Sequence, residues 1–245
     1  LDLHHHVTVS GGVVFLGGWR GYRPLMRVSL ISGDRLPFDK AALAGIGPSA
    51  WPLPVRLRTE QDGDDHAVLV AGTDRPALLV VAASGTAVAE WPLPAPIRFP
   101  DGGAGYRVSG DGRITFVSGS RTVVEFDPVH GVRMLWRHTR DIRAFPPLLD
   151  DQTLWLADDA GITVVDLDRE IVTEVETPSS RAVVAVTRTA GRAWFAFTDG
   201  SLVAVDRSGG HSTAARVLPR IDRLSAGQDG LIHALGKGRI TTFRA

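Results

Sequence analysis

The chain has 245 residues, of which 44% are hydrophobic and 22% are charged, and these proportions exclude an intrinsically disordered protein. Its 27 basic and 27 acidic residues give a formal net charge of zero, which argues against nucleic acid or an anionic membrane as a partner. The absence of cysteine excludes disulfides, thiolate catalysis and Cys-ligated metal sites. No apolar run approaches the roughly 20 residues that a membrane-spanning helix requires.

The basic residues are almost all arginines, because Lys40 and Lys237 are the only lysines. Together with abundant Ala, Gly, Val and Asp, this bias is typical of a high-GC bacterial genome, such as that of an actinobacterium. A chain without thiols tolerates either redox state, so the composition leaves the compartment open, with the cytoplasm favoured.

In chain order, the sequence is a succession of short runs of β-branched and aromatic residues, separated by Gly, Asp, Ser and Pro. Turn signals recur every 8–12 residues or so, which is typical of an all-β fold. One segment, from Phe38 to Gly45, has the pattern of a helical turn with Asp39 as its N-cap. The sequence therefore predicts an all-β protein with almost no helix.

The strand runs also repeat. They begin near residues 113, 152, 192 and 231, about 40 residues apart, and earlier runs near residues 13 and 67 follow the same pattern with longer spacers. A period of about 40 residues with four strands per unit indicates a β-propeller, and the alternative is a β-sandwich or barrel. Three repeats have a strand that ends in aspartate, at Asp127, Asp166 and Asp206. We interpret these carboxylates as acceptors for N–H groups of the following turn rather than as a functional ring.

We predict a single propeller domain of six four-stranded blades. The blades are expected at residues 4–40, 53–93, 104–138, 143–177, 181–217 and 221–245, with residues 1–3 completing the last. The inner strands of the third to fifth blades are expected at residues 106–108, 144–149 and 183–186. That last blade lacks a fourth strand at its C-terminal end, and an unpaired third strand would be an exposed sheet edge. We therefore expect residues 1–3 to pair with the strand around Arg239–Phe243 and close the ring.

Residues 145–168, residues 191–210 and the stretch 124–136 resemble the repeat of the PQQ-like, quinoprotein-type β-propellers. The likeness covers residues 104–245 well and residues 1–103 loosely. It implies the fold and no catalytic residue. The quinone-binding members depend on a calcium site with an Asn ligand and often on a vicinal Cys pair, and this chain has neither residue type. The repeat is also WD40-like in length, but the chain has no Trp-Asp dipeptide. We therefore expect no cofactor and no bound metal.

One candidate binding segment is basic and aromatic. It combines four arginines with a tryptophan, namely Arg133, Trp136, Arg137, Arg140 and Arg143. Guanidinium groups beside an aromatic ring can hold a phosphate or a carboxylate-rich partner. The alternative is an outer strand that runs over the rim into the next blade, with its arginines solvated or paired to nearby aspartates.

A second candidate lies in the long turn of the first blade. It contains the arginines Arg20, Arg23 and Arg27 beside Trp19 and Tyr22. Loops on a rigid scaffold often carry binding residues, and Trp, Tyr and Arg are the usual hot-spot residues of protein interfaces.

These patterns predict a non-catalytic β-propeller that binds a protein or peptide as one part of a larger bacterial protein. No nucleophile motif and no cofactor loop is present in the sequence. The alternative is an enzyme or a binder of small anions that uses the axial funnel. Its expected lining is a set of arginines on or near the inner strands, namely Arg56, Arg58, Arg107, Arg143 and Arg223.

Overall fold

The computed structural model describes residues 6–17, 26–38, 51–58, 65–70, 76–97, 105–109, 112–127, 130–143, 146–177, 182–189, 191–214, 217–227 and 230–244. These residues contain strands and no helix, which confirms the all-β prediction. No helix of the described ranges has the length and apolar character needed to cross a bilayer. Residues 1–3, to which we assigned ring closure, and most of the predicted helical turn after Phe38 lie outside the described residues.

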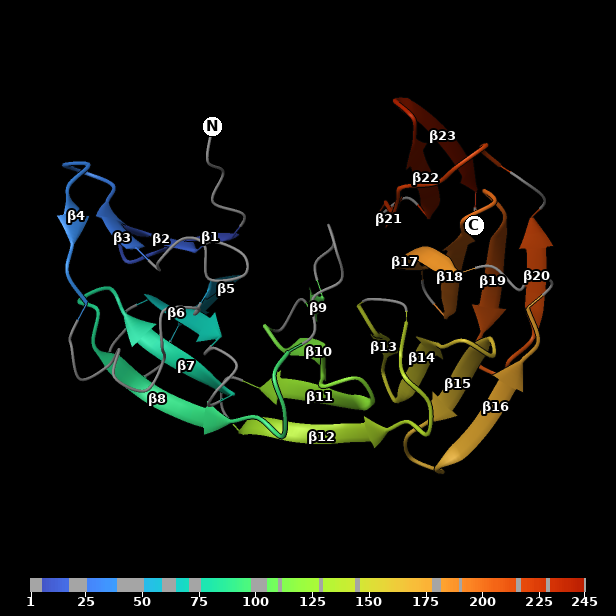
Figure 1. The fold of residues 1–245 in the computed structure, drawn as a ribbon, viewed down its shortest axis with the longest axis horizontal. Coiled ribbons are helices and arrows are strands. Elements are labelled where there is room, and N and C mark those ends of the chain that lie inside the picture. The colour runs from blue at the N-terminus through green and yellow to red at the C-terminus, as the bar shows by residue number, and fades with distance from the viewer. Residues whose placement is uncertain are drawn as a thin grey trace. The chain divides into compact units, whose positions relative to one another are not determined.

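The described strands form six small sheets, each built from strands that follow one another in the chain (Figure 1). The first two sheets contain β1 (His6–Ser10), β2 (Val13–Gly17), β3 (Met26–Ser29) and β4 (Arg35–Leu36), then β5 (Trp51–Arg58), β6 (Asp65–Val70), β7 (Ala77–Ala82) and β8 (Ala87–Pro92). The third contains β9 (Tyr106–Val108), β10 (Ile114–Ser118), β11 (Thr122–Asp127) and β12 (Gly131–Arg137).

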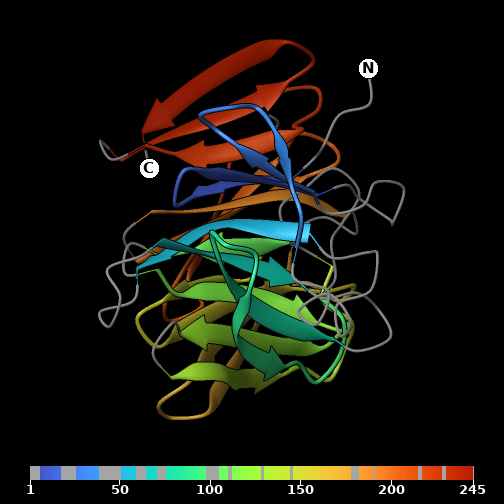
Figure 2. The ribbon, with the colours of Figure 1, turned by 90° about the vertical axis from the view of Figure 1, so that its left-hand side faces the viewer.

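The fourth sheet contains β13 (Leu148–Asp150), β14 (Thr153–Ala157), β15 (Ile162–Asp166) and β16 (Ile171–Val175), and the fifth contains β17 (Val183–Thr189), β18 (Arg192–Phe197), β19 (Leu202–Asp206) and β20 (His211–Ala214). The last sheet has three described strands, β21 (Arg223–Ala226), β22 (Leu231–Gly236) and β23 (Arg239–Arg244), drawn in red in Figure 2. Every strand pair with a described register is antiparallel, as expected for strands joined by tight turns.

The chain divides into two compact units. The first unit comprises residues 1–97, 108–114 and 126–133, and the second comprises residues 98–107, 115–125 and 134–245. Within the first unit, β1 lies beside β5, and within the second, β17 lies beside β21. The first strands of neighbouring sheets therefore contact one another, as the inner strands of propeller blades do.

The middle strands of the second unit are almost entirely buried. All five residues of β14 are buried, and so are five of the six residues of β18. A strand covered on both faces is a continuous apolar run instead of an alternating one. Trp155 packs with Phe195 and Phe197 in one core cluster that joins the fourth and fifth sheets. Truncating an aromatic side chain in such a core typically costs about 3–5 kcal/mol.

The repeated aspartates close the turns after their strands. Asp166 Oδ1 accepts the backbone N–H groups of Asp168 and Arg169, both at 3.1 Å. Asp206 Oδ1 accepts those of Ser208 and Gly210, both at 2.8 Å. Asp127 Oδ1 accepts the N–H of His130 at 3.1 Å. The structural interpretation of these carboxylates is confirmed at all three positions.

The turn between β18 and β19 requires a glycine, because the backbone of another segment approaches it closely. Gly200 has a φ of +83°, and a Cβ at this position would lie 1.6 Å from the carbonyl oxygen of Leu218. Gly200 also accepts a hydrogen bond from the neighbouring segment, because Val217 donates its N–H to Gly200 O at 2.9 Å. Glycine therefore allows the segment that leads into the last sheet to pack against this turn.

Arg27 departs from the sequence interpretation. We grouped it with Arg20 and Arg23 in an exposed loop, but it lies on β3 and is only 3% exposed. Its guanidinium donates to the carbonyl oxygens of Ala83 at 2.5 Å and Ser84 at 2.7 Å. Burial lowers the pKa of Arg27. Arg27 thus ties the first sheet to the turn after β7, and the arginine is structural.

Candidate functional site

Two clusters of arginines and aspartates lie in the second unit, and the first surrounds the predicted basic segment. Residues 138–143 form a linker between β12 and the fourth sheet, which we call the 138–143 linker. Its backbone is bound to the turn between β10 and β11, because His138 N donates to Arg121 O and Ile142 N donates to Ser120 O, each at 2.8 Å. Ile142 is fully buried in a core cluster with Leu154. The linker is therefore part of the folded framework.

Asp158 is the centre of this first cluster, which we call the Asp158 network. Its Oδ2 lies 2.6 Å from His138 Nε2 and accepts from Arg140 Nε at 2.8 Å. Its Oδ1 accepts the backbone N–H groups of Ala160 at 2.7 Å and Gly161 at 3.2 Å. Arg140 also donates through Nη2 to Glu174 Oε1 at 2.7 Å. Each oxygen of the buried Asp158 carboxylate therefore has at least two partners.

Asp158 is ionised in this network. Burial alone would raise the pKa of Asp158, but the hydrogen bonds from His138 and Arg140 outweigh it, and the pKa is lowered below its ordinary value of 3.8. The hydrogen bonds to Asp158 and Glu174 in turn raise the pKa of Arg140. This arrangement holds the 138–143 linker against the turn after β14.

The structure separates the five predicted residues of the basic segment. Arg140 pairs with Asp158 and Glu174, and Arg143 pairs with Asp159 through Nε at 3.0 Å, on the surface. Trp136 is partly buried against a core cluster. Arg133 and Arg137 are exposed on β12, beside Met134, which is 63% exposed. The other predicted group, Trp19, Arg20, Tyr22 and Arg23, lies outside the described residues.

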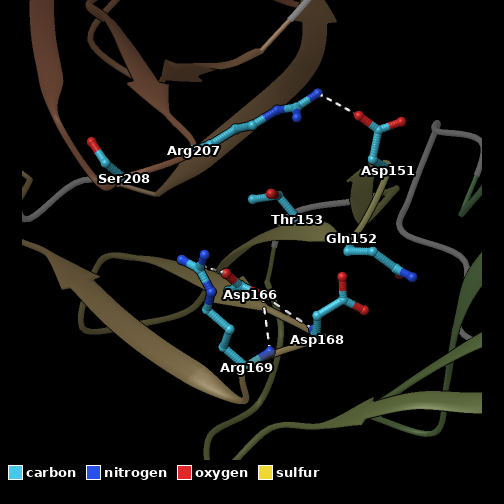
Figure 3. A pocket seen from close by; sticks show the side chains of 8 residues that line it. All are labelled: Asp151, Gln152, Thr153, Asp166, Asp168, Arg169, Arg207 and Ser208. Carbon is cyan, nitrogen blue, oxygen red and sulfur yellow. Dashed lines mark hydrogen bonds and ion pairs between the residues drawn. The ribbon is translucent and has the colours of Figure 1, made fainter.

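The second cluster adjoins a pocket of about 470 Å³ among three turns of the second unit (Figure 3). The turns are those after β13, β15 and β19. They and the start of β14 supply the lining residues Asp151, Gln152, Thr153, Asp166, Asp168, Arg169, Arg207 and Ser208. In Figure 3, Arg207 and Ser208 lie on one side of the pocket, and Asp166, Asp168 and Arg169 lie on the other. The lining is therefore polar and carries both signs of charge.

The local sequence explains why this lining is held in place. The carboxylates of Asp166 and Asp206 fix the turns after β15 and β19 from within, as described above. Trp155 on β14 donates its indole N–H to Asp206 O at 3.2 Å, which links the fourth sheet to the end of β19. Asp151 has a φ of +50°, a conformation that aspartate tolerates in tight turns. The pocket is thus formed by short, well-bonded turns.

The second ionic cluster, which we call the Asp150 cluster, shares Arg207 and Asp151 with the pocket lining. Asp150, at the end of β13, accepts from Arg188 Nη1 through Oδ1. Its Oδ2 accepts from Arg207 Nη2 at 2.7 Å and from the backbone N–H of Gly191 at 3.2 Å. Arg207 Nη2 also donates to Asp151 Oδ2 at 2.8 Å. Arg207 therefore belongs both to the pocket lining and to the Asp150 cluster.

Positive charge predominates around Arg188. Burial lowers the pKa of Arg188, and the neighbouring charges of Arg107 and Arg207 lower it further. Arg107, on β9, also has its pKa lowered by burial. Arg188 Nε is buried and has no hydrogen-bond partner among the described residues. The cluster is thus incompletely neutralised.

Sequence reasoning found one member of this cluster, because Arg107 was predicted to lie on an inner strand. It missed Asp150, Arg188 and Arg207. A signal was present in the repeat, since Asp150 and Arg188 are 38 residues apart and both lie near the end of the first strand of their sheets. Opposite charges about one period apart on first strands indicate an ion pair between neighbouring blades.

Within the described ranges, no three His, Asp or Glu side chains are grouped so as to hold a metal ion. Ser208 lines the pocket, but it donates its hydroxyl to Asp206 Oδ1 at 2.7 Å, the same oxygen that caps the turn. This geometry gives Ser208 a role in the turn.

Comparison of the sequence with protein-family models finds no match, and comparison with curated proteins finds none either. Comparison of the structure with solved structures does find similar proteins. Streptogramin B lyase has a TM-score of 0.55 and 16% identity, over 100% of this chain and 85% of that one. BamB from Moraxella catarrhalis has a TM-score of 0.55 and 17% identity, over 98% and 76%. A chain of the Mitotic Checkpoint Complex has a TM-score of 0.58 and 13% identity, over 100% and 75%.

Streptogramin B lyase and BamB are β-propeller proteins, so the similarity assigns this chain a fold of the propeller kind. Identities of this size support the fold alone. The fold-level resemblance that we drew from the repeat is confirmed.

Proposed function

We propose that this chain is a six-bladed β-propeller that acts without catalysis and binds a protein or peptide partner, as part of a larger bacterial protein. The six sheets of the described residues, in chain order, support the blade number. One similar structure belongs to the Mitotic Checkpoint Complex, so a chain of this fold serves in a protein assembly. Another is named a lyase, so the choice between binding and catalysis has to come from the site itself.

The observation that carries the proposal is the pocket among the turns after β13, β15 and β19. About 470 Å³ is within the range of sites that hold small molecules or a few side chains. Its walls present Arg207 on one side and Asp168 on the other, with the neutral amide of Gln152 between the turns. Polar groups of both signs on a rigid scaffold suit the mixed side chains of a peptide.

The proposal retains part of the predicted binding surface. We propose further contact residues on β12 and in the long turn of the first blade. They are Arg133, Trp136 and Arg137 on β12, and Trp19, Arg20, Tyr22 and Arg23 in the turn. Arg140 and Arg143 are assigned a structural role, because each already pairs with acidic side chains of the chain itself.

Peptide selection tests the proposed function. A random peptide library displayed on phage is selected against the immobilised protein, and the enriched peptides are titrated by fluorescence anisotropy. We expect Gln152→Trp, which fills the pocket from an exposed turn, to weaken binding at least tenfold. Ser32→Trp, which adds the same bulk to an exposed turn of the first unit, should leave the affinity unchanged. Failure to enrich any peptide, or equal affinity for both variants, would overturn the proposal.

Closure of the ring is part of the same proposal. The last sheet has three strands in the described residues, and Ile240 on its edge strand β23 is 70% exposed. We propose that residues 1–3 pair with β23 and protect this edge. Deletion of residues 1–6 should then lower the melting temperature or cause aggregation, and an unchanged melting temperature would contradict the closure.

A further inference from the structure

We propose that Arg188 and Arg207 form a binding site for a carboxylate group at the edge of the pocket, so that the partner presents an acidic side chain or a C-terminal carboxylate there. The identity of the partner as a peptide rests on the proposed function, whereas the carboxylate site can be tested by itself. The turn-capping hydrogen bonds of Asp166 and Asp206 do not involve the side chains of these arginines.

The charge of the Asp150 cluster selects the ligand class. The guanidinium groups of Arg188 and Arg207 contact the carboxylates of Asp150 and Asp151, and the positive charge of Arg107 also acts on Arg188. One positive charge is left over, which matches the single charge of a carboxylate. A phosphate monoester carries about −1.5 to −2 at neutral pH and would meet stronger repulsion from the two aspartates.

The cluster also has hydrogen-bonding capacity in reserve. Arg188 uses Nη1 for Asp150, but its buried Nε has no acceptor among the described residues. A buried donor without a partner is costly, and a carboxylate can accept from two guanidinium nitrogens at once. Arg27 has a similar unpartnered Nε, but it is almost completely buried, whereas the side chain of Arg188 is 24% exposed. The exposed part of the Arg188 side chain is therefore open to a ligand, whereas Arg27 is not.

A ligand in the pocket meets the site at Arg207. The Arg207 side chain is 46% exposed and lines the pocket, and its second carboxylate partner, Asp151, is 75% exposed. An ion pair between such exposed groups contributes little to stability. An incoming carboxylate can thus replace Asp151 on Arg207 at small cost, while Asp150 keeps both arginines in place.

The opposite wall of the pocket limits which residues can lie next to the carboxylate in a bound peptide. Asp168 lines the pocket across from Arg207 in Figure 3. A run of several acidic residues would be repelled by this side chain. The site therefore favours one carboxylate next to neutral or basic residues.

The test uses the full chain labelled with ¹⁵N and follows the Arg Nε–Hε signals by NMR. The Arg188 signal is identified by its loss in Arg188→Lys. Four probes are titrated: acetyl-Gly-Glu-Gly-amide, the matched acetyl-Gly-Gln-Gly-amide, acetyl-Gly-Gly-Gly with a free C-terminus, and inorganic phosphate. We expect saturable shifts of the Arg188 signal with a carboxylate probe, and at least tenfold weaker binding of the glutamine peptide.

The two carboxylate probes distinguish an acidic side chain from a C-terminus as the natural source. Arg207→Gln should weaken the carboxylate probe at least tenfold, whereas Arg220→Gln, at an exposed arginine that does not line the pocket, should not. The backbone amide spectrum of each variant verifies that it is folded. Failure of both carboxylate probes to bind more tightly than the Gln peptide, saturation by phosphate alone, or an unchanged affinity in Arg207→Gln would overturn the carboxylate site. Carboxylate binding without any peptide enriched on phage would sustain the site and refute the peptide partner.

Discussion

The Asp158 network and the Asp150 cluster are built from the same residue types but are neutralised differently. In the Asp158 network, one buried carboxylate accepts from His138, Arg140 and two backbone N–H groups, and Arg140 has Glu174 as a second partner. In the Asp150 cluster, the guanidinium of Arg188 faces two further arginines and retains a buried nitrogen without a partner.

This difference indicates which cluster stabilises the fold and which can bind a ligand. A fully paired buried carboxylate stabilises the segments that it joins, and it has no capacity left for an added group. A partly exposed cluster with excess positive charge gains from an added anion. The number of hydrogen-bond partners of each polar atom is therefore a better indicator of a binding site than the number of arginines in a segment.

The largest expected effect is the loss of Asp158. Asp158→Ala leaves the buried His138 ring and Arg140 Nε without their acceptor, and breaking a buried pair costs about 3 kcal/mol. The melting temperature should fall by roughly 6–12 °C for a chain of this size. Asp159→Ala, which removes the adjacent exposed partner of Arg143, should cause a much smaller change. Similar melting temperatures for the two variants would show that the Asp158 network is not structural.

The pH dependence of stability provides the next test. The pKa of Asp158 is lowered in the folded protein, so its stabilisation is fully present above the unfolded pKa of about 3.8. It is lost as the pH falls through the lower folded pKa. The difference in melting temperature between the wild-type protein and Asp158→Asn should therefore be larger at pH 5 than at about pH 3 and shrink as the pH falls below about 4. A difference that persists undiminished at about pH 2 would contradict the assignment of Asp158 as an ionised acceptor.

A smaller effect on stability is expected in the other cluster. Arg188→Met keeps the apolar stem of the side chain and removes a charge that repels Arg107 and Arg207. Asp150 retains Arg207 and the N–H of Gly191 as partners. We expect the melting temperature to change by less than about 3 °C, measured by circular dichroism. A loss as large as that of Asp158→Ala would place Arg188 in the structural framework instead.

Much of the strand arrangement could be predicted from the sequence because each blade repeats a pattern of about 40 residues. The predicted inner strand at Tyr106–Val108 coincides with β9, and the one at Val183 begins β17. The inner strand predicted from Ala144 to Leu149 is instead β13, Leu148–Asp150. Pro146 and Pro147 precede it, and proline has no N–H to donate to a neighbouring strand.

The sites were harder to predict because their partners are distant in the sequence. The basic segment allowed two interpretations for Arg140, and the choice depended on Asp158, 18 residues further on at the end of β14. Arg207 and Asp150 are 57 residues apart and meet only once neighbouring sheets are packed. Arg27 was misassigned because its carbonyl partners are 56 and 57 residues away.

The most direct test of the contrast between the two clusters is one experiment on two variants, Arg140→Gln and Arg207→Gln. Each is measured for its melting temperature and for its affinity for acetyl-Gly-Glu-Gly-amide. The account predicts that Arg140→Gln lowers the melting temperature by several degrees and keeps the affinity, because Arg140 neutralises Asp158. Arg207→Gln should keep the melting temperature and weaken the affinity at least tenfold. A loss of affinity in Arg140→Gln, or a loss of stability without a loss of affinity in Arg207→Gln, would contradict it.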